Sequence, residues 1–102
     1  MGIFDFLFGK RPYPPQHQQQ VEKLLEELQR IGAKDDFLSE RPGGQYNLQC
    51  RHIRAREIGV RLDEIGGLEL MEYAQRRVKK KTSTEMADHL GYCWTDIGRW
   101  IP

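Results

Sequence analysis

The sequence predicts an all-α fold, namely a small bundle of three to four helices with an irregular N-terminal extension. Apolar side chains recur at intervals of three and four residues in several stretches, and this spacing places them on one face of a helix. Glycine and proline separate these stretches. At 102 residues the chain forms one domain at most, so we expect residues 18–102 to make a single α-helical domain that follows a short extension, residues 1–17.

The extension, residues 1–17, is predicted to be an apolar turn followed by a linker rich in proline and glutamine. In a helix, one face of the turn would carry four large apolar side chains: Ile3, Phe4, Leu7 and Phe8. This turn either docks onto the body and closes the core, or serves as an N-terminal hook that binds a partner or a membrane surface. In the membrane alternative, residues 3–11 attach the protein peripherally, and Lys10 and Arg11 meet lipid headgroups.

A first helix is predicted over about residues 18–31, where the apolar period is clearest. Its apolar face comprises Val21, Leu24, Leu25, Leu28 and Ile31. Gly32 follows as a C-terminal stop, because glycine adopts the left-handed conformation at a helix end without a Cβ clash. The rest of this helix is charged, so we expect it to lie across the other helices and to pack through one stripe.

Two helices joined at Gly66-Gly67 are predicted at the centre of the chain, over about 50–65 and 67–80. The apolar face of the first consists of Ile58, Leu62 and Ile65, and that of the second consists of Leu70, Met71, Ala74 and Val78. Small residues flank the first of these faces, so another segment could approach its backbone closely.

A last helix is predicted over about 83–100, and it would supply the largest contribution to the core. Thr82, with Glu85 three residues later, fits a capping box at its start. Its wide apolar face comprises Met86, Leu90, Cys93, Trp94, Ile97 and Ile101, with Trp100 at the edge. We therefore expect the last three helices to form the core of the domain.

The second half of the chain carries the order RxIGxxLxxxGGxxLM, from Arg56 to Met71, followed by WxxIGxW, from Trp94 to Trp100. This order resembles a segment of small uncharacterised bacterial proteins. The resemblance implies a compact helical unit and a bacterial source, and it brings no activity, ligand or catalytic residue with it. Residues 1–47 show nothing comparable.

Charge is balanced overall but uneven along the chain. Sixteen basic and 15 acidic residues leave a formal net charge of +1, so no global field draws the protein to nucleic acid or to an anionic membrane. Five cations nevertheless fall within residues 76–81, and further arginines precede them. Together they form a candidate binding patch for an anion or an acidic peptide: Arg51, Arg54, Arg61, Arg76, Arg77, Lys79, Lys80 and Lys81.

Residues 82–101 also have features of a helix-turn-helix. Ala87 and Gly91 match the small residue and the glycine of that motif, and 94–101 would be the recognition helix. The basic run 76–81 would then contact phosphates. The segment 94–101 has only one cation, Arg99, which is few for a recognition helix. The competing interpretation is therefore one continuous core helix with Gly91 on its outer side.

A metal site can be drawn from Cys50, His52, His89 and Cys93, since His89 and Cys93 are spaced for one helix face and a tetrahedral ion. Cys50-x-His52 is an uncommon zinc pair, however, and a half-buried cysteine with two histidines is an ordinary part of a helical core. No nucleophile motif and no phosphate-cradling glycine loop occurs. We therefore predict no metal, no cofactor and no catalytic residue.

The sequence favours a non-enzymatic protein-interaction module whose partner is a protein of unknown identity. The first alternative is nucleic-acid binding through the helix-turn-helix-like segment 82–101 with the basic run 76–81. The second is attachment to a membrane surface through residues 3–11. Two cysteines make no disulfide framework, and no signal peptide or bilayer-spanning run is visible, so we expect a cytoplasmic protein. The oligomeric state stays open.

Overall fold

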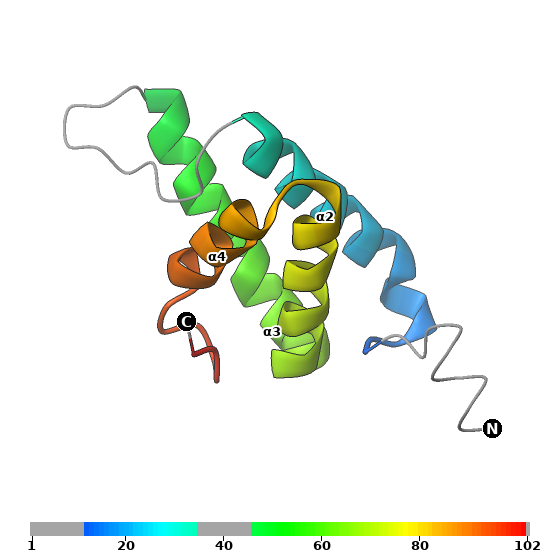
Figure 1. Cartoon of the computed structure of the whole chain (residues 1–102). Helices are drawn as coiled ribbons and strands as arrows, with labels where there is room; N and C mark the ends of the chain where they lie inside the picture. Colours follow the sequence, from blue (N-terminus) through cyan, green and yellow to red (C-terminus); the bar gives the residue numbers. More distant parts are fainter. Residues whose placement is uncertain (1–11, 35–45, 102) are drawn as a thin grey trace.

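The computed structural model describes residues 12–34 and 46–101, and within these ranges it contains helices and turns but no strand. After a single 3-10 turn, η1 (Pro15–His17), come three helices: α2 (Gln18–Lys34), α3 (Tyr46–Lys81) and α4 (Thr84–Cys93). The predicted all-α class and the number of helices are thus confirmed (Figure 1).

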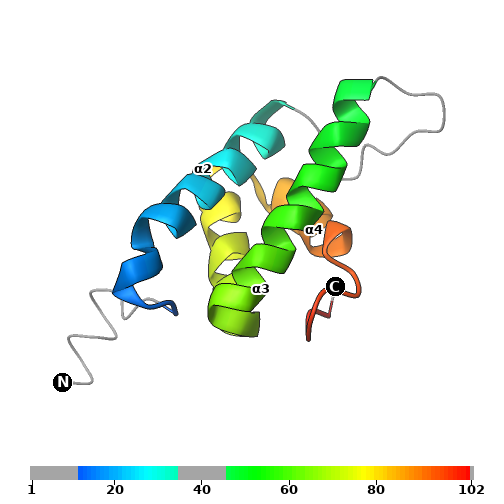
Figure 2. The same cartoon turned by 180° about the vertical axis from the view of Figure 1, so that it is seen from behind.

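The long helix α3 is bent at Gly67, whose backbone is not helical (φ 66°, ψ −157°). This combination of angles is essentially confined to glycine, so the residue type sets the position of the bend. Residues 46–66 form a first arm and residues 68–81 a second arm, which returns beside the first (Figures 1 and 2). The predicted joint at Gly66-Gly67 is confirmed, and the two central helices are the two arms of one element.

The helix α2 packs on α3 through the apolar stripe that its sequence predicts. All five residues of that stripe are buried: Val21, Leu24, Leu25, Leu28 and Ile31. The helix runs to Lys34 rather than ending at Gly32, so the predicted stop is wrong. Gly32 is itself buried. A glycine inside a helix costs only about 1 kcal/mol relative to alanine, so a glycine by itself does not end a helix.

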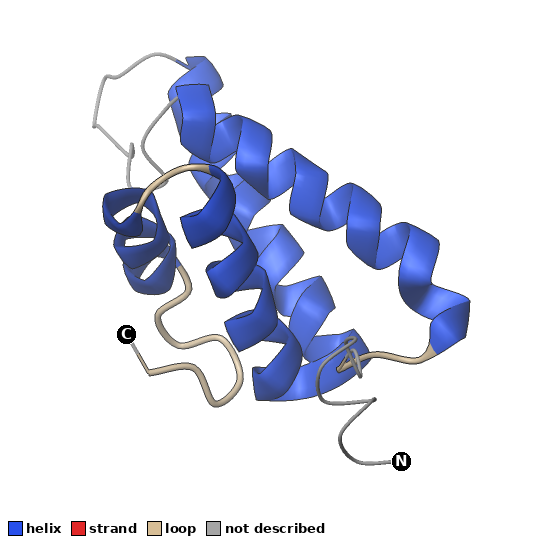
Figure 3. Ribbon diagram, turned by 45° about the vertical axis from the view of Figure 1, so that its right-hand side comes forward, coloured by secondary structure: helices blue, strands red, loops and turns tan. Residues whose placement is uncertain are grey.

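The helix α4 ends at Cys93, and residues 94–100 form turns where the sequence predicts helix, so this part of the prediction is wrong (Figure 3). Tertiary hydrogen bonds take the place of helical ones here. Nη1 of Arg56 donates to the carbonyl oxygens of Cys93 (2.6 Å) and Thr95 (3.0 Å). Asp96 then takes a positive φ of 71°, which an α-helix does not continue through.

The start of α4 is capped by Ser83, whose hydroxyl accepts a hydrogen bond of 3.1 Å from the main-chain nitrogen of Met86. Thr82, which the predicted capping box uses, instead donates from its hydroxyl to the carbonyl oxygen of Val78 on α3 (2.7 Å). One hydroxyl therefore closes α3 and the next opens α4, which fixes the short connection between the two helices.

Trp94, the first residue after α4, lies at the centre of the core and packs against the first arm of α3. It is fully buried, and its indole nitrogen donates to the carbonyl oxygen of Ala55 (2.9 Å). A Cβ at Gly59 would overlap its ring, so the small residue is what admits the indole. Trp100 meets that ring edge to face, with 5.1 Å between the ring centroids, and donates to the carbonyl oxygen of Gly91 (2.7 Å).

Most of the apolar face predicted for the last segment is buried. The residues with 5% exposure or less are Leu90, Cys93, Trp94 and Ile97, and Met86 packs at the edge of the core. Ile101 is the exception, since 85% of its surface is exposed. If the helix continued to residue 100, Ile101 would lie on its apolar face. The turns after Cys93 instead place Ile101 away from the core.

The chain enters the described body at the bend of α3. The carbonyl oxygen of Pro12 lies where a Cβ at Gly66 would be, so the absence of a side chain there admits the incoming backbone. Tyr13 is only 8% exposed, and its ring meets that of Tyr73 on the second arm edge to face, with 6.1 Å between the centroids. Tyr13 therefore belongs to the core, although the sequence places it in the linker.

Candidate functional site

An open groove lies on the second arm of α3 near its C-terminus. It has a volume of about 560 Å³ and is lined by Tyr73, Arg76, Arg77, Lys79, Lys80 and Thr84. Residues three and four apart share one face of a helix, so the residues from α3 are brought together by their spacing alone. Thr84 joins them because the connection after Lys81 turns α4 back towards α3. We call this surface the cationic groove.

One cation of the groove is held in place by its neighbours. The guanidinium of Arg77 lies 5.9 Å from the centre of the Tyr73 ring and donates to its hydroxyl (3.0 Å). It also pairs with Glu22 of α2 (3.3 Å). Burial would lower the pKa of Arg77, but the hydrogen bond to Tyr73 and the charge of Glu22 outweigh it and hold that pKa above its usual range. Arg77 and Tyr73 therefore form a fixed wall.

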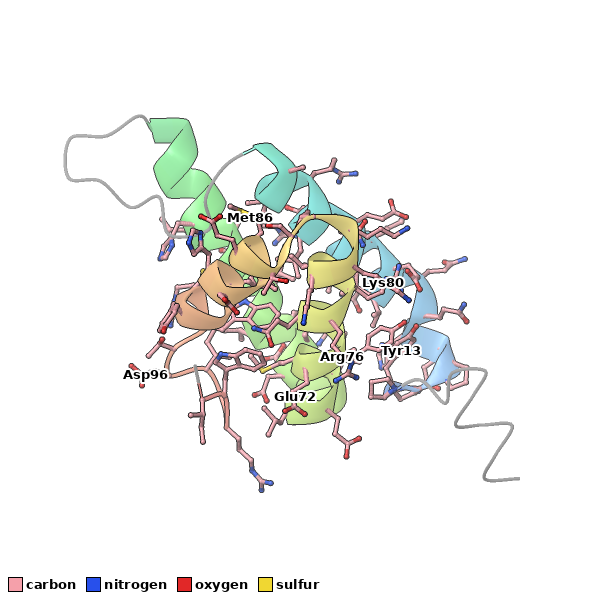
Figure 4. All side chains as sticks on the ribbon, viewed as in Figure 1. Tyr13, Glu72, Arg76, Lys80, Met86 and Asp96 are labelled. Atoms are coloured by element: carbon pink, nitrogen blue, oxygen red, sulfur yellow. The ribbon has the colours of Figure 1, made fainter. Side chains whose placement is uncertain are left out.

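Arg76, Lys79 and Lys80 are exposed, and none of them forms an ion pair within the described part of the chain. Figure 4 shows Arg76 and Lys80 on the same side of α3, with Glu72 further from its C-terminal end. Residues 76–80 rise by about 6 Å along the helix axis. Three positive charges therefore face solvent within a short distance, and the described lining of the groove contains no carboxylate.

Two other arginines of the predicted patch bind α2 instead. Nε and Nη2 of Arg54 donate to the carboxylate of Glu27 (2.7 and 3.0 Å), and this hydrogen bonding raises the pKa of Arg54 against the opposing effect of burial. Nη2 of Arg61 donates to the side-chain oxygen of Gln20 (3.1 Å). Both guanidinium groups join α2 to the first arm of α3, and neither lines the groove.

The structure therefore divides the predicted patch. The four members that line the groove are Arg76, Arg77, Lys79 and Lys80. Lys81 is exposed at the last residue of α3 and is not among the lining residues. The side chain of Arg51 lies outside the described residues, and so do the four hook residues, Ile3, Phe4, Leu7 and Phe8.

Two residues of the groove were missed by sequence reasoning. Tyr73 lies three residues before Arg76 and four before Arg77, a spacing that could have placed its ring beside the basic run. Thr84 had no such signal, because its position depends on how the chain turns between α3 and α4. The groove is thus a joint product of helix periodicity and of that turn.

Two of the four residues considered for a metal site meet in the core. Sγ of Cys93 lies 3.8 Å from Nδ1 of His52 and 3.9 Å from its main-chain oxygen. Nε2 of His89 is 4.0 Å from the carboxylate of Glu85. No group of three metal-ligating side chains forms among the residues with described side chains, which do not include Cys50.

The helix-turn-helix interpretation is wrong in its geometry, because residues 94–101 contain turns and no recognition helix. The competing interpretation of one continuous helix is wrong for the same reason, and Gly91 is buried rather than on an outer side. Tertiary contacts of Trp94 and Arg56 decide this stretch, and neither contact is visible in a local sequence pattern.

Within residues 12–34 and 46–101, no helix combines the length and the apolar composition that crossing a bilayer takes. Comparison of the chain with protein families, with curated proteins and with solved structures finds no match.

Proposed function

We propose that this domain is a non-enzymatic interaction module that binds an acidic segment of a protein partner in the cationic groove. The observation that carries the proposal is the cluster of Arg76, Lys79 and Lys80, three exposed cations that form no ion pair within the described residues. Charged donors of this kind make the strongest hydrogen bonds to carboxylates. Tyr73 and the aliphatic parts of the basic side chains add an apolar surface for a neighbouring side chain.

The size of the cationic surface favours a peptide segment over a nucleic-acid duplex. On an extended strand, side chains on the same side repeat every ~6.6 Å, which is close to the ~6 Å rise along the helix axis from Arg76 to Lys80. A duplex presents a longer row of phosphates than the exposed cations of the groove can meet. With a net charge of +1, the protein also has little general attraction for a polyanion.

The test is fluorescence anisotropy with the full chain and a short labelled peptide in which glutamates alternate with alanines around one phenylalanine. Arg76→Glu combined with Lys80→Glu should weaken binding about tenfold or more, since two attractive charges become repulsive. The matched control is Lys23→Glu combined with Arg99→Glu, which changes the net charge equally at two exposed residues outside the groove.

Equal losses in the two double variants would show that only net charge matters and would overturn the proposal. A labelled DNA duplex of similar charge is measured in parallel. If the duplex binds more tightly than the peptide and depends on the same two residues, nucleic-acid binding replaces the interaction with an acidic protein segment.

A further inference from the structure

We propose that the cationic groove recognises a phosphorylated side chain on the partner segment. This inference rests on the proposed function and names the chemical group that the groove is suited to bind. A phosphomonoester carries a charge of about −1.5 to −2 at neutral pH and three terminal oxygens that accept hydrogen bonds. A carboxylate offers one negative charge and two oxygens.

The number and variety of donors in the groove favour the phosphate. Arg76 offers a planar fork, Lys79 and Lys80 offer ammonium groups, and Thr84 offers a hydroxyl. The three cations form no ion pair within the described residues, so a single carboxylate would leave two of them uncompensated. A phosphate dianion compensates two charges at one point, and its oxygens accept from several donors at once.

The groove is also held in shape before a ligand arrives. On one side, Arg77 is tied to Tyr73 and to Glu22 of α2. On the other side, the hydroxyl of Ser83 fixes the first turn of α4 and with it the place of Thr84. The walls of the groove therefore need no rearrangement, and binding has to order only the exposed side chains of Arg76, Lys79 and Lys80.

The proposal commits to a phosphate carried by a protein segment, because the groove offers more than charged donors. Its volume of about 560 Å³ exceeds what one phosphate needs and falls within the range of ligand pockets. The ring of Tyr73 and the stems of the basic side chains can take up the neighbouring residues of a peptide. A free anion or a lipid headgroup would leave that apolar surface uncovered.

The test compares three labelled peptides of identical sequence that carry serine, glutamate or phosphoserine at the central position. All are titrated against the full chain by fluorescence anisotropy. We expect the phosphoserine peptide to bind about tenfold more tightly than the glutamate peptide. Its affinity should rise between pH 5.5 and 7.5, as the second phosphate proton with a pKa of about 6 is lost, whereas the affinity of the glutamate peptide should stay level.

Two conservative variants of the full chain separate recognition of the phosphate from attraction by charge. Arg76→Lys keeps the charge but removes the fork, and Thr84→Val keeps the shape but removes the hydroxyl. Each variant should weaken the binding of the phosphoserine peptide several-fold and leave the affinity for the glutamate peptide nearly unchanged. Unaltered thermal unfolding of both variants, followed by circular dichroism, would exclude a general loss of structure.

The outcomes distinguish the two proposals. If the glutamate and phosphoserine peptides bind alike, the phosphate inference is overturned and the binding of acidic segments stands. If neither binds more tightly than the serine peptide, both proposals fail. A third outcome is that vesicles containing phosphatidic acid displace the phosphoserine peptide, and that this peptide binds no more tightly than free phosphoserine. In that case the ligand is a lipid headgroup, and the commitment to a protein segment is overturned.

Discussion

The indole nitrogen of Trp94 donates a hydrogen bond of 2.9 Å to the main-chain oxygen of Ala55, 39 residues earlier in the chain. This contact anchors the turns after α4 to the first arm of α3 and closes the core. Trp94→Phe removes the donor and part of the buried ring, so we expect the free energy of unfolding to fall by about 2–3 kcal/mol. Urea denaturation followed by circular dichroism measures this, and Tyr92→Phe at an exposed residue of α4 serves as the control.

The packing of the same ring explains why position 59 needs glycine. A Cβ there would overlap the indole of Trp94, so Gly59→Ala should destabilise the protein by about 1–3 kcal/mol although alanine favours helix. Combining it with Trp94→Phe should cost less than the sum of the two single changes, because the smaller ring relieves the overlap. Additive losses in this double-mutant cycle would contradict the assigned contact.

The bend of α3 makes a different prediction for Gly67. Nothing lies near a Cβ at this position, but its φ of 66° and ψ of −157° are available almost only to glycine. Both Gly67→Ala and Gly67→Asn should therefore lower the free energy of unfolding by about 1–3 kcal/mol. Asparagine tolerates the left-handed helical region better than other residues do, but that region does not include a ψ of −157°. Glu69→Ala, an exposed change two residues later, should stay within about 0.5 kcal/mol of the original.

The guanidinium of Arg56 supplies the end of α4 with hydrogen bonds that the helix itself lacks. Arg56→Ala should cost about 1–3 kcal/mol, because the carbonyl oxygens of Cys93 and Thr95 lose a charged donor. Arg56→Lys should recover part of this stability, because the ammonium group can donate to one of the two carbonyl oxygens more readily than to both. Thermal unfolding compares the two variants, and equal stability of Arg56→Ala and the unaltered protein would exclude the capping role.

The ion pair between Arg54 and Glu27 should contribute little despite its short distances. Both side chains are substantially exposed, at 45% and 30%, so solvent and salt screen their attraction. A double-mutant cycle of Arg54→Ala and Glu27→Ala should give a coupling below about 1 kcal/mol, and the coupling should shrink as salt is added. A coupling that is several-fold larger and insensitive to salt would show that the pair is effectively buried.

Local periodicity is enough to predict most of α2 and of both arms of α3, but it misses the end of α2 at Lys34 and the start of α3 at Tyr46. An apolar stripe such as Ile58 with Leu62 records which side of a helix is buried, and that record is local in the sequence. The bend was predictable too, since only glycine takes the backbone angles of Gly67. The end of α4 was not, because Arg56, which replaces its helical hydrogen bonds, lies 37 residues before Cys93.

The candidate site shows the same division. The basic run was identified from the sequence because its members are contiguous on one helix. Sequence could not separate Arg76 and Lys80 from Arg54 and Arg61, since the distinction lies in partners on α2. Those partners are 27 and 41 residues away, and helix periodicity carries no information on contacts of that range.

The edge-to-face contact of Tyr13 with Tyr73 places the start of the described body beside a wall of the groove. Nη1 of Arg77 donates to the hydroxyl of Tyr73, so the packing of Tyr13 also bears on the fixed guanidinium of the groove. A change that loosens the Tyr13 ring should therefore disturb the groove as well as the core. Docking of the entering chain and the shape of the binding surface are coupled through one phenol ring.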